Sequence, residues 1–172
     1  MDYILHNPSI LLLSGLLALI FVFIKERWVS NQELGNEKMA IISKNIADGA
    51  MSFLKAEYSI LLFFVLIVGG LLTYLGAITD GSDMLLGVSF LIGAICSGLA
   101  GFIGMKVATK ANVRTTNAAQ NSLGKALNIA FSGGSVMGLG VVGLGLLGLG
   151  SLFIYYNSTF VIDGASDIDK VL

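Results

Sequence analysis

Three long stretches of this sequence contain no charged residue, and their length constrains the fold more than any other feature. They are residues 58–78, 84–105 and 134–156. Each is as long as the roughly 20 residues that a helix needs to cross the hydrocarbon core of a bilayer. The sequence therefore predicts three transmembrane helices.

Residues 4–24 are expected to form a fourth span. Pro8 suits the first turn of a helix, where its missing N–H costs nothing. A cleaved signal peptide would have basic residues before its apolar core, whereas here Lys25 and Arg27 follow it. We interpret residues 4–24 as a retained span of an all-α integral membrane protein, whose four helices form the N-terminal part of a larger multi-helix bundle.

Composition supports a lipid environment and excludes one class of partner. Only 12% of the residues are charged and 55% are hydrophobic, whereas soluble domains carry about a quarter charged residues. The formal net charge is −1 and no basic stripe is present, so nucleic acid is not an expected partner.

Lysine and arginine are distributed unevenly between the predicted spans. Nine of the ten fall in segments 25–57 and 106–133, and the tenth lies in the tail 157–172. Because short cytoplasmic loops collect basic residues, we expect these two segments to be cytoplasmic and both termini to be non-cytoplasmic in a multi-pass cell-membrane protein. Within the first segment, apolar residues at helical spacing predict an amphipathic interfacial helix that runs into the second span; they are Met39, Ile42, Ile46, Ala50, Phe53 and Leu54.

Small residues recur four positions apart in the third and fourth spans. Lipid offers no hydrophobic drive for helix association, so small residues that permit close backbone approach are typical of helix contacts. The predicted packing residues are Gly93, Ser97, Gly98, Gly101, Gly104, Gly134 and Gly138. A flexible, ligand-approaching turn at residues 133–135 is the less favoured alternative.

Groups that could perform chemistry are scarce. The apolar cores contain no carboxylate or basic residue, and the one histidine, His6, lies at the outer edge of the first span. An ion path through a membrane normally needs such groups inside it. The acidic residues of the first cytoplasmic segment are scattered, and Asp163, Asp167 and Asp169 lie in the non-cytoplasmic tail. From the residues alone we predict no catalytic, substrate-binding or metal-binding residue in this segment.

Three segments nevertheless resemble a known family, the membrane-bound, ion-translocating inorganic pyrophosphatases. Residues 101–114 are similar to the signature after that family's third helix, residues 126–148 to the start of its fourth, and residues 46–58 to the stretch before its second. The positions that carry the signature are Gly104, Lys106, Ala111, Asn112, Val113, Arg114, Gly133 and Gly134.

The resemblance implies the N-terminal portion of a pump that hydrolyses pyrophosphate on the cytoplasmic side and moves H⁺ or Na⁺ outward. Family members are expected to be homodimers that use Mg²⁺, held by aspartate- and lysine-rich motifs on later helices. Those motifs do not occur here, so we expect outer-ring scaffold helices that pack with the remaining helices of the pump, bind no Mg²⁺ themselves and are inactive alone. The alternative is a free-standing four-helix structural or assembly subunit without enzymatic activity.

Overall fold

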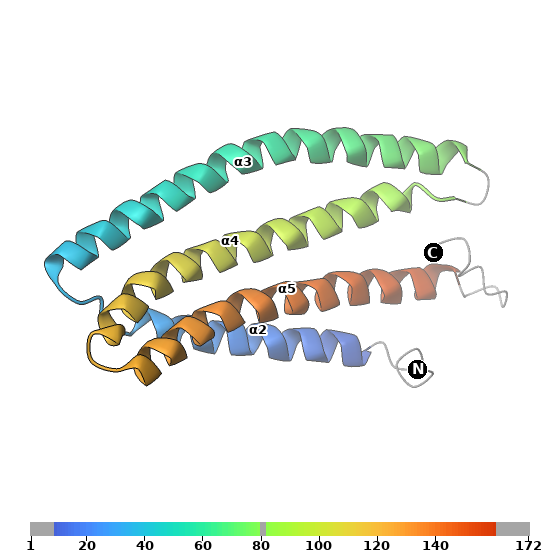
Figure 1. Ribbon diagram of the computed structural model, residues 1–172. Coiled ribbons are helices and arrows are strands. Elements are labelled where there is room, and N and C mark those ends of the chain that lie inside the picture. The colour runs from blue at the N-terminus through green and yellow to red at the C-terminus, as the bar shows by residue number, and fades with distance from the viewer. Residues whose placement is uncertain (1–8, 80–81, 161–172) are drawn as a thin grey trace.

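The computed structural model describes residues 9–79 and 82–160, and the main chain of this part forms four long helices (Figure 1). They are α2 (Ser9–Ser30), α3 (Glu37–Ile78), α4 (Leu85–Ala119) and α5 (Leu123–Phe160). All four are long and apolar enough to cross a membrane. The all-α membrane fold predicted from the sequence is therefore confirmed. Residues 4–8 of the first predicted span and the acidic tail residues lie outside the described part.

The helices lie side by side in the spatial order α3, α4, α5, α2 (Figure 1). Helix α4 packs against both α3 and α5, and α2 packs mainly against α5, with a smaller contact to α4. Helices α3 and α2 are therefore the two edges of the bundle. Many apolar side chains on the edge helices are exposed, as expected for surfaces that face lipid or further helices.

Three of the helices extend well beyond the predicted spans. Helix α3 has 42 residues, a length of roughly 60 Å and about twice the thickness of the hydrocarbon core. The predicted amphipathic segment forms its first half and continues into the second span without a break. Most of segments 25–57 and 106–133 is helical too, and the connectors at this end are only residues 31–36 and 120–122.

Local sequence explains where α3 begins. Asn36 precedes the helix, and its side-chain Oδ1 accepts a 2.9 Å hydrogen bond from the N–H of Met39. This N-cap satisfies one of the backbone donors that the first turn leaves without a partner. Gly35 has a φ of 90°, a left-handed conformation that glycine adopts without strain, so the chain can reverse direction between α2 and α3.

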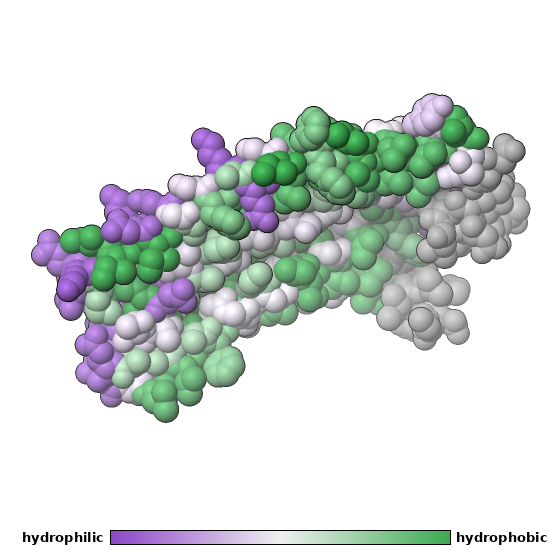
Figure 2. Space-filling model, turned by 45° about the horizontal axis from the view of Figure 1, so that its top comes forward, coloured by the Kyte–Doolittle hydropathy of each residue, from purple (hydrophilic) through white to green (hydrophobic). Residues whose placement is uncertain are grey.

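Two small buried clusters hold the bundle together where α2, α4 and α5 meet. Val22, Val107 and Val136 form the first, one from each helix. Trp28 packs against the second, which consists of residues from the end of α4 and the start of α5. The second cluster lies at the end where polar residues gather on the surface (Figure 2).

Candidate functional site

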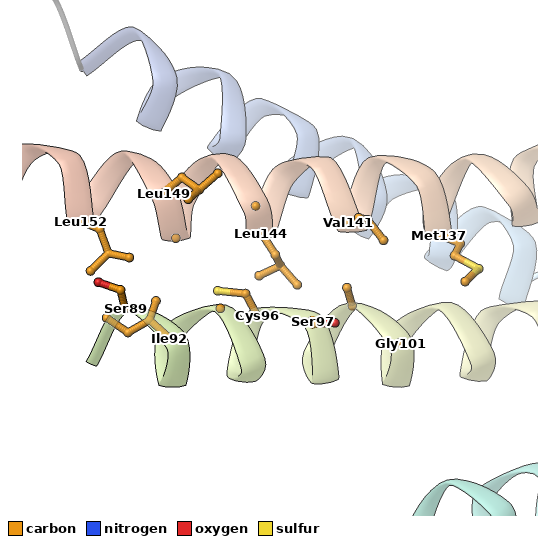
Figure 3. A pocket seen from close by; sticks show the side chains of 14 residues that line it. Ser89, Ile92, Cys96, Ser97, Gly101, Met137, Val141, Leu144, Leu149 and Leu152 are labelled. Carbon is orange, nitrogen blue, oxygen red and sulfur yellow. The ribbon is translucent and has the colours of Figure 1, made fainter. Parts of the chain in front are cut away.

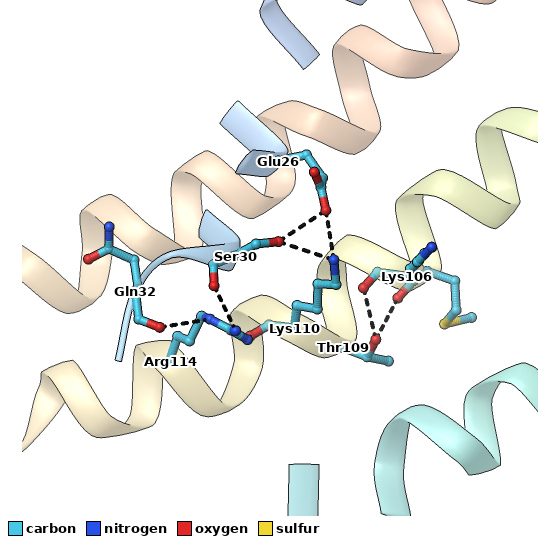
Figure 4. A network of polar contacts seen from close by, with 8 residues as sticks. Glu26, Ser30, Gln32, Lys106, Thr109, Lys110 and Arg114 are labelled. Carbon is cyan, nitrogen blue, oxygen red and sulfur yellow. Dashed lines mark hydrogen bonds and ion pairs between the residues drawn. The ribbon is translucent and has the colours of Figure 1, made fainter. Parts of the chain in front are cut away.

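A polar network joins the last turn of α2 to the second half of α4 (Figure 4). Lys110 and Arg114 are four residues apart in α4, so helical geometry places both on one face. Glu26 and Ser30 are related in the same way in α2, and the two pairs face each other. The network lies beyond the charge-free apolar cores, which end at residue 24 in α2 and at residue 105 in α4.

An ion pair forms the first half of this network. Lys110 Nζ lies 2.7 Å from Glu26 Oε1 and donates a second hydrogen bond, of 3.1 Å, to Ser30 Oγ. Ser30 Oγ donates in turn to Glu26 Oε1 at 3.0 Å. The hydrogen bond from Lys110 is the main cause that lowers the pKa of Glu26, and partial burial opposes it. The Glu26 carboxylate is therefore stabilised in its charged form.

Arg114 forms the second half by capping the end of α2. Its Nη2 donates to the carbonyl oxygen of Ser30 at 2.9 Å, and its Nε donates to that of Gln32 at 3.1 Å. The last carbonyls of a helix have no partner within the helix and carry partial negative charge. Arg114 is only 8% exposed. Burial lowers the pKa of its guanidinium, and Glu26 partly offsets this, but an arginine remains protonated in proteins.

Asn117, one turn after Arg114, holds the connector between α2 and α3. Its Nδ2 lies 3.4 Å from the carbonyl oxygen of Glu33. A methyl group added at Gly35 would lie 2.8 Å from Asn117 Oδ1. The second half of α4 therefore fixes both the end of α2 and the start of α3.

Residues of the resemblance signature also form the contact between α4 and α5. A methyl group at Gly104 would lie 2.8 Å from Cγ of Met137, and one at Gly133 would lie 2.7 Å from Cβ of Ala111. Gly104 and Ala111 are both buried. The signature glycines thus lie in the contact between α4 and α5, and the signature residue Arg114 lies in the polar network between α2 and α4.

The other signature residues and the predicted packing residues occupy varied surroundings. Lys106 is exposed, with its Nζ 5.8 Å from the ring centroid of Phe102, Asn112 is exposed and Val113 is partly buried. A methyl group at Gly101 would lie 3.0 Å from Tyr58 Oη. Among the predicted packing residues, four glycines have open space where a methyl group would be added, namely Gly93, Gly98, Gly134 and Gly138.

Gly93, Ser97 and Gly101 line an apolar groove of about 490 Å³ between α4 and α5 (Figure 3). Cys96 of α4 and Leu144 of α5 face each other across it. The lining is almost entirely apolar and contains no aspartate, glutamate, histidine, lysine or arginine. This groove suits an apolar side chain or helix and has no group that would bind a charged substrate.

Sequence reasoning missed the contact between α2 and α5. A methyl group at Gly15 would lie 3.0 Å from the carbonyl oxygen of Gly143, and one at Gly143 would lie 3.1 Å from that of Gly15. Gly15 is the single glycine of α2, so no repeat of small residues indicated this face. The hydrogen bonds of Arg114 were missed because their acceptors are backbone carbonyls, which leave no sequence signal.

The carboxylates of the described part do not fit a Mg²⁺-pyrophosphate site. Such a site needs several oxygen ligands that converge, and within residues 9–79 and 82–160 no group of three or more acidic, histidine or cysteine side chains could hold a metal ion. Glu26, the acid in the network, is engaged by Lys110. What the arrangement does in the described part is fix helix ends.

Comparison with known proteins agrees with the resemblance to the membrane-bound pyrophosphatases. A family model described as inorganic H⁺ pyrophosphatase matches residues 16–171. One relative, from Clostridium tetani, is named as a candidate K⁺-stimulated, pyrophosphate-energized sodium pump. It is 52% identical to this chain, over 74% of this chain and 18% of the relative's own length. A K⁺-insensitive pyrophosphate-energized proton pump of Methanosarcina mazei is 39% identical over 88% of this chain and 22% of its own length.

The chain spans about a fifth of the length of these relatives. The family match covers α4 and α5 completely and most of α2. It therefore includes every residue of the polar network between α2 and α4. On these grounds the chain belongs to the family of membrane-bound, ion-translocating inorganic pyrophosphatases.

Proposed function

We propose that this chain supplies N-terminal scaffold helices of a pyrophosphate-energised H⁺ or Na⁺ pump, whose catalytic groups lie in the rest of the protein. One observation carries the proposal: the polar side chains that lie close together bind the backbone at a helix end or bind one another. Arg114 binds backbone carbonyls and Glu26 binds Lys110. Both are contacts that fix helices in place.

The proposed orientation places the polar end of the bundle in the cytoplasm. Figure 2 shows hydrophilic residues gathered at one end, where α2 ends, α3 begins and the connector from α4 to α5 lies. Nine of the ten basic residues belong to the two segments at this end, and basic residues are retained on the cytoplasmic side. Both termini would then be non-cytoplasmic.

The proposed partners are further helices of the same pump. The groove between α4 and α5 is apolar, with glycines on both sides, and small residues allow another helix to approach closely. Homodimerisation is proposed for the whole pump, in line with the resemblance. The Mg²⁺ requirement is likewise proposed for the whole pump and not for this segment.

A reconstitution experiment tests the scaffold role. The M. mazei relative would be expressed without its corresponding helices, alone or together with this chain, and pyrophosphate-driven acidification of vesicles would be followed. We expect proton transport only when the two pieces are present together. A free-standing subunit predicts no rescue by this chain, so an inactive mixture in which both pieces are inserted would contradict the proposal.

A second measurement tests the catalytic assignment. The chain purified in detergent with Mg²⁺ and pyrophosphate should release no phosphate above the blank, because its described carboxylates do not converge. The full-length M. mazei relative, treated identically, serves as the positive control. Turnover by the chain alone would show that a catalytic centre had been overlooked.

A further inference from the structure

Lys25 lies where the apolar core of α2 ends, at the seam between α2 and α5. Its Nζ is 5.3 Å from the ring centroid of Trp28 and 5.7 Å from that of Phe21. It also lies 3.4 Å from Ser132 Oγ on α5. The ammonium group is therefore held at one place by two aromatic rings and a hydroxyl.

No carboxylate in the described part balances this charge. The ion pair there joins Lys110 to Glu26. Arg27, two residues on, lies 5.8 Å from the ring centroid of Phe23 and likewise forms no salt bridge in the described part. Ser132 is neutral and 3% exposed, and it accepts from one of the three N–H groups of the ammonium. The positive charge remains available to an anion.

The position of α2 indicates what kind of anion can reach Lys25. Helix α2 is an edge of the bundle (Figure 1), and apolar residues along its length are exposed, among them Leu13, Leu17, Ile20 and Ile24. A surface of this kind contacts acyl chains when the helix spans a bilayer. Lys25 follows directly in the sequence, so in a bilayer that α2 spans it would lie near the headgroups of those lipids.

Aromatic and basic residues at this level are typical of headgroup contacts. Aromatic side chains such as that of Trp28 prefer the membrane interface, and basic pockets between transmembrane helices bind anionic headgroups. The rings beside Lys25 also hold its ammonium in a defined place, which reduces the side-chain entropy lost on binding.

We propose that the seam between α2 and α5 binds an anionic phospholipid, whose phosphate contacts Lys25 while its acyl chains lie along the outer face of α2. The proposal needs only that α2 spans a bilayer, so it is independent of the pump role.

Trp28 provides the probe, because it is the one tryptophan of the chain and is adjacent to Lys25. The 172-residue chain would be placed in vesicles of phosphatidylcholine with a minority of phosphatidylglycerol, and bromine atoms that quench tryptophan would be carried on one lipid or the other. We expect phosphatidylglycerol to be enriched about fivefold around Trp28 relative to its bulk fraction. For each variant, the fluorescence of Trp28 in vesicles with brominated lipid is divided by its fluorescence in vesicles of the same composition without bromine.

Three variants locate the effect. Lys25→Gln should bring the enrichment close to one, whereas Lys25→Arg should retain it because the charge remains. Lys44→Gln removes one charge from the exposed first half of α3 and should leave the enrichment unchanged. Circular dichroism of each variant verifies that the helices are intact.

Several outcomes would overturn the proposal. Equal quenching by the two lipids in the unchanged chain would show that no anionic lipid is preferred. An enrichment that survives Lys25→Gln would place the site elsewhere. Loss of the enrichment in inorganic phosphate, but not in chloride at equal ionic strength, would show that the site takes free phosphate instead of a lipid.

Discussion

Arg114 Nη2 donates a 2.9 Å hydrogen bond to the carbonyl oxygen of Ser30, the last residue of α2, so a side chain of α4 caps a helix that ends 84 positions earlier in the sequence. The same guanidinium also donates to Lys110 O of its own helix. One buried cation therefore satisfies acceptors on both helices, and it fixes their relative position along the bundle.

Removing this cap should destabilise the bundle. Arg114→Ala leaves the partly buried carbonyls of Ser30 and Gln32 without this donor, and a hydrogen bond to a charged group is worth about 1.5–3 kcal/mol. Thermal unfolding in detergent, followed by Trp28 fluorescence, should show a clearly lower midpoint. Lys106→Gln, which alters an exposed lysine of the same helix, is the control. Equal midpoints for the two variants would contradict the capping role.

The ion pair between Glu26 and Lys110 should give a pH-dependent contribution to stability. The pKa of Glu26 is lowered in the folded chain, chiefly by the hydrogen bond from Lys110. Its contribution is therefore fully present above the ordinary glutamate value, and it is lost as pH falls through the lower folded-state pKa.

Unfolding midpoints of the unchanged chain and of Glu26→Gln, measured as a function of pH, would reveal this contribution. At neutral pH the unchanged chain should be the more stable, and the difference should shrink as the pH falls from the ordinary glutamate pKa through the lowered one. Because both partners are partly exposed, the difference at neutral pH should be modest. A difference that grows on acidification would contradict the sign of the shift.

The contact between Gly15 and Gly143 should tolerate no side chain. A methyl group at Gly15 would lie 2.9 Å from Leu147 Cγ and 3.0 Å from a backbone oxygen, so Gly15→Ala should push α2 away from α5 and lower the unfolding midpoint. Gly145→Ala is a matched control, because that position in α5 has open space. Alanine favours a helix over glycine by up to about 1 kcal/mol, so the control should be neutral or slightly stabilising.

The sequence predicted the helices well because charge-free length and helical spacing are local properties. Helical spacing also predicted the amphipathic segment that runs into the second span, which is the first half of α3. The sequence did not show that α4 and α5 continue far past their apolar cores, since charged and alanine-rich segments can be helix or loop. It also could not tell which glycine meets which helix. Gly104 and Gly15 look alike in sequence, and only the packed bundle shows that they contact Met137 and Gly143. The cap formed by Arg114 depends on backbone positions, which no residue pattern records.

Helix α3 contacts the rest of the bundle through α4, and Tyr58 provides a polar link between them. Its Oη donates a 2.6 Å hydrogen bond to the carbonyl oxygen of Gly98. Tyr58→Phe removes this hydrogen bond but leaves no acceptor without a partner, because the carbonyl of Gly98 lies within a helix and still accepts its regular backbone hydrogen bond. Interhelical hydrogen bonds in membranes are worth about 0.6 kcal/mol on average.

The expected effect is therefore small but localised. Hydrogen exchange of the chain in detergent should be faster in α3 of Tyr58→Phe and unchanged in α5, whereas Tyr74→Phe, at a position 62% exposed, should alter neither helix.

Gly101→Ala should act through the same contact, because its methyl group would lie 3.0 Å from Tyr58 Oη and would displace that hydroxyl. The double variant should then be less destabilised than the sum of the two single variants, since both disrupt one interaction. Strictly additive effects would show that Tyr58 does not link α3 to α4.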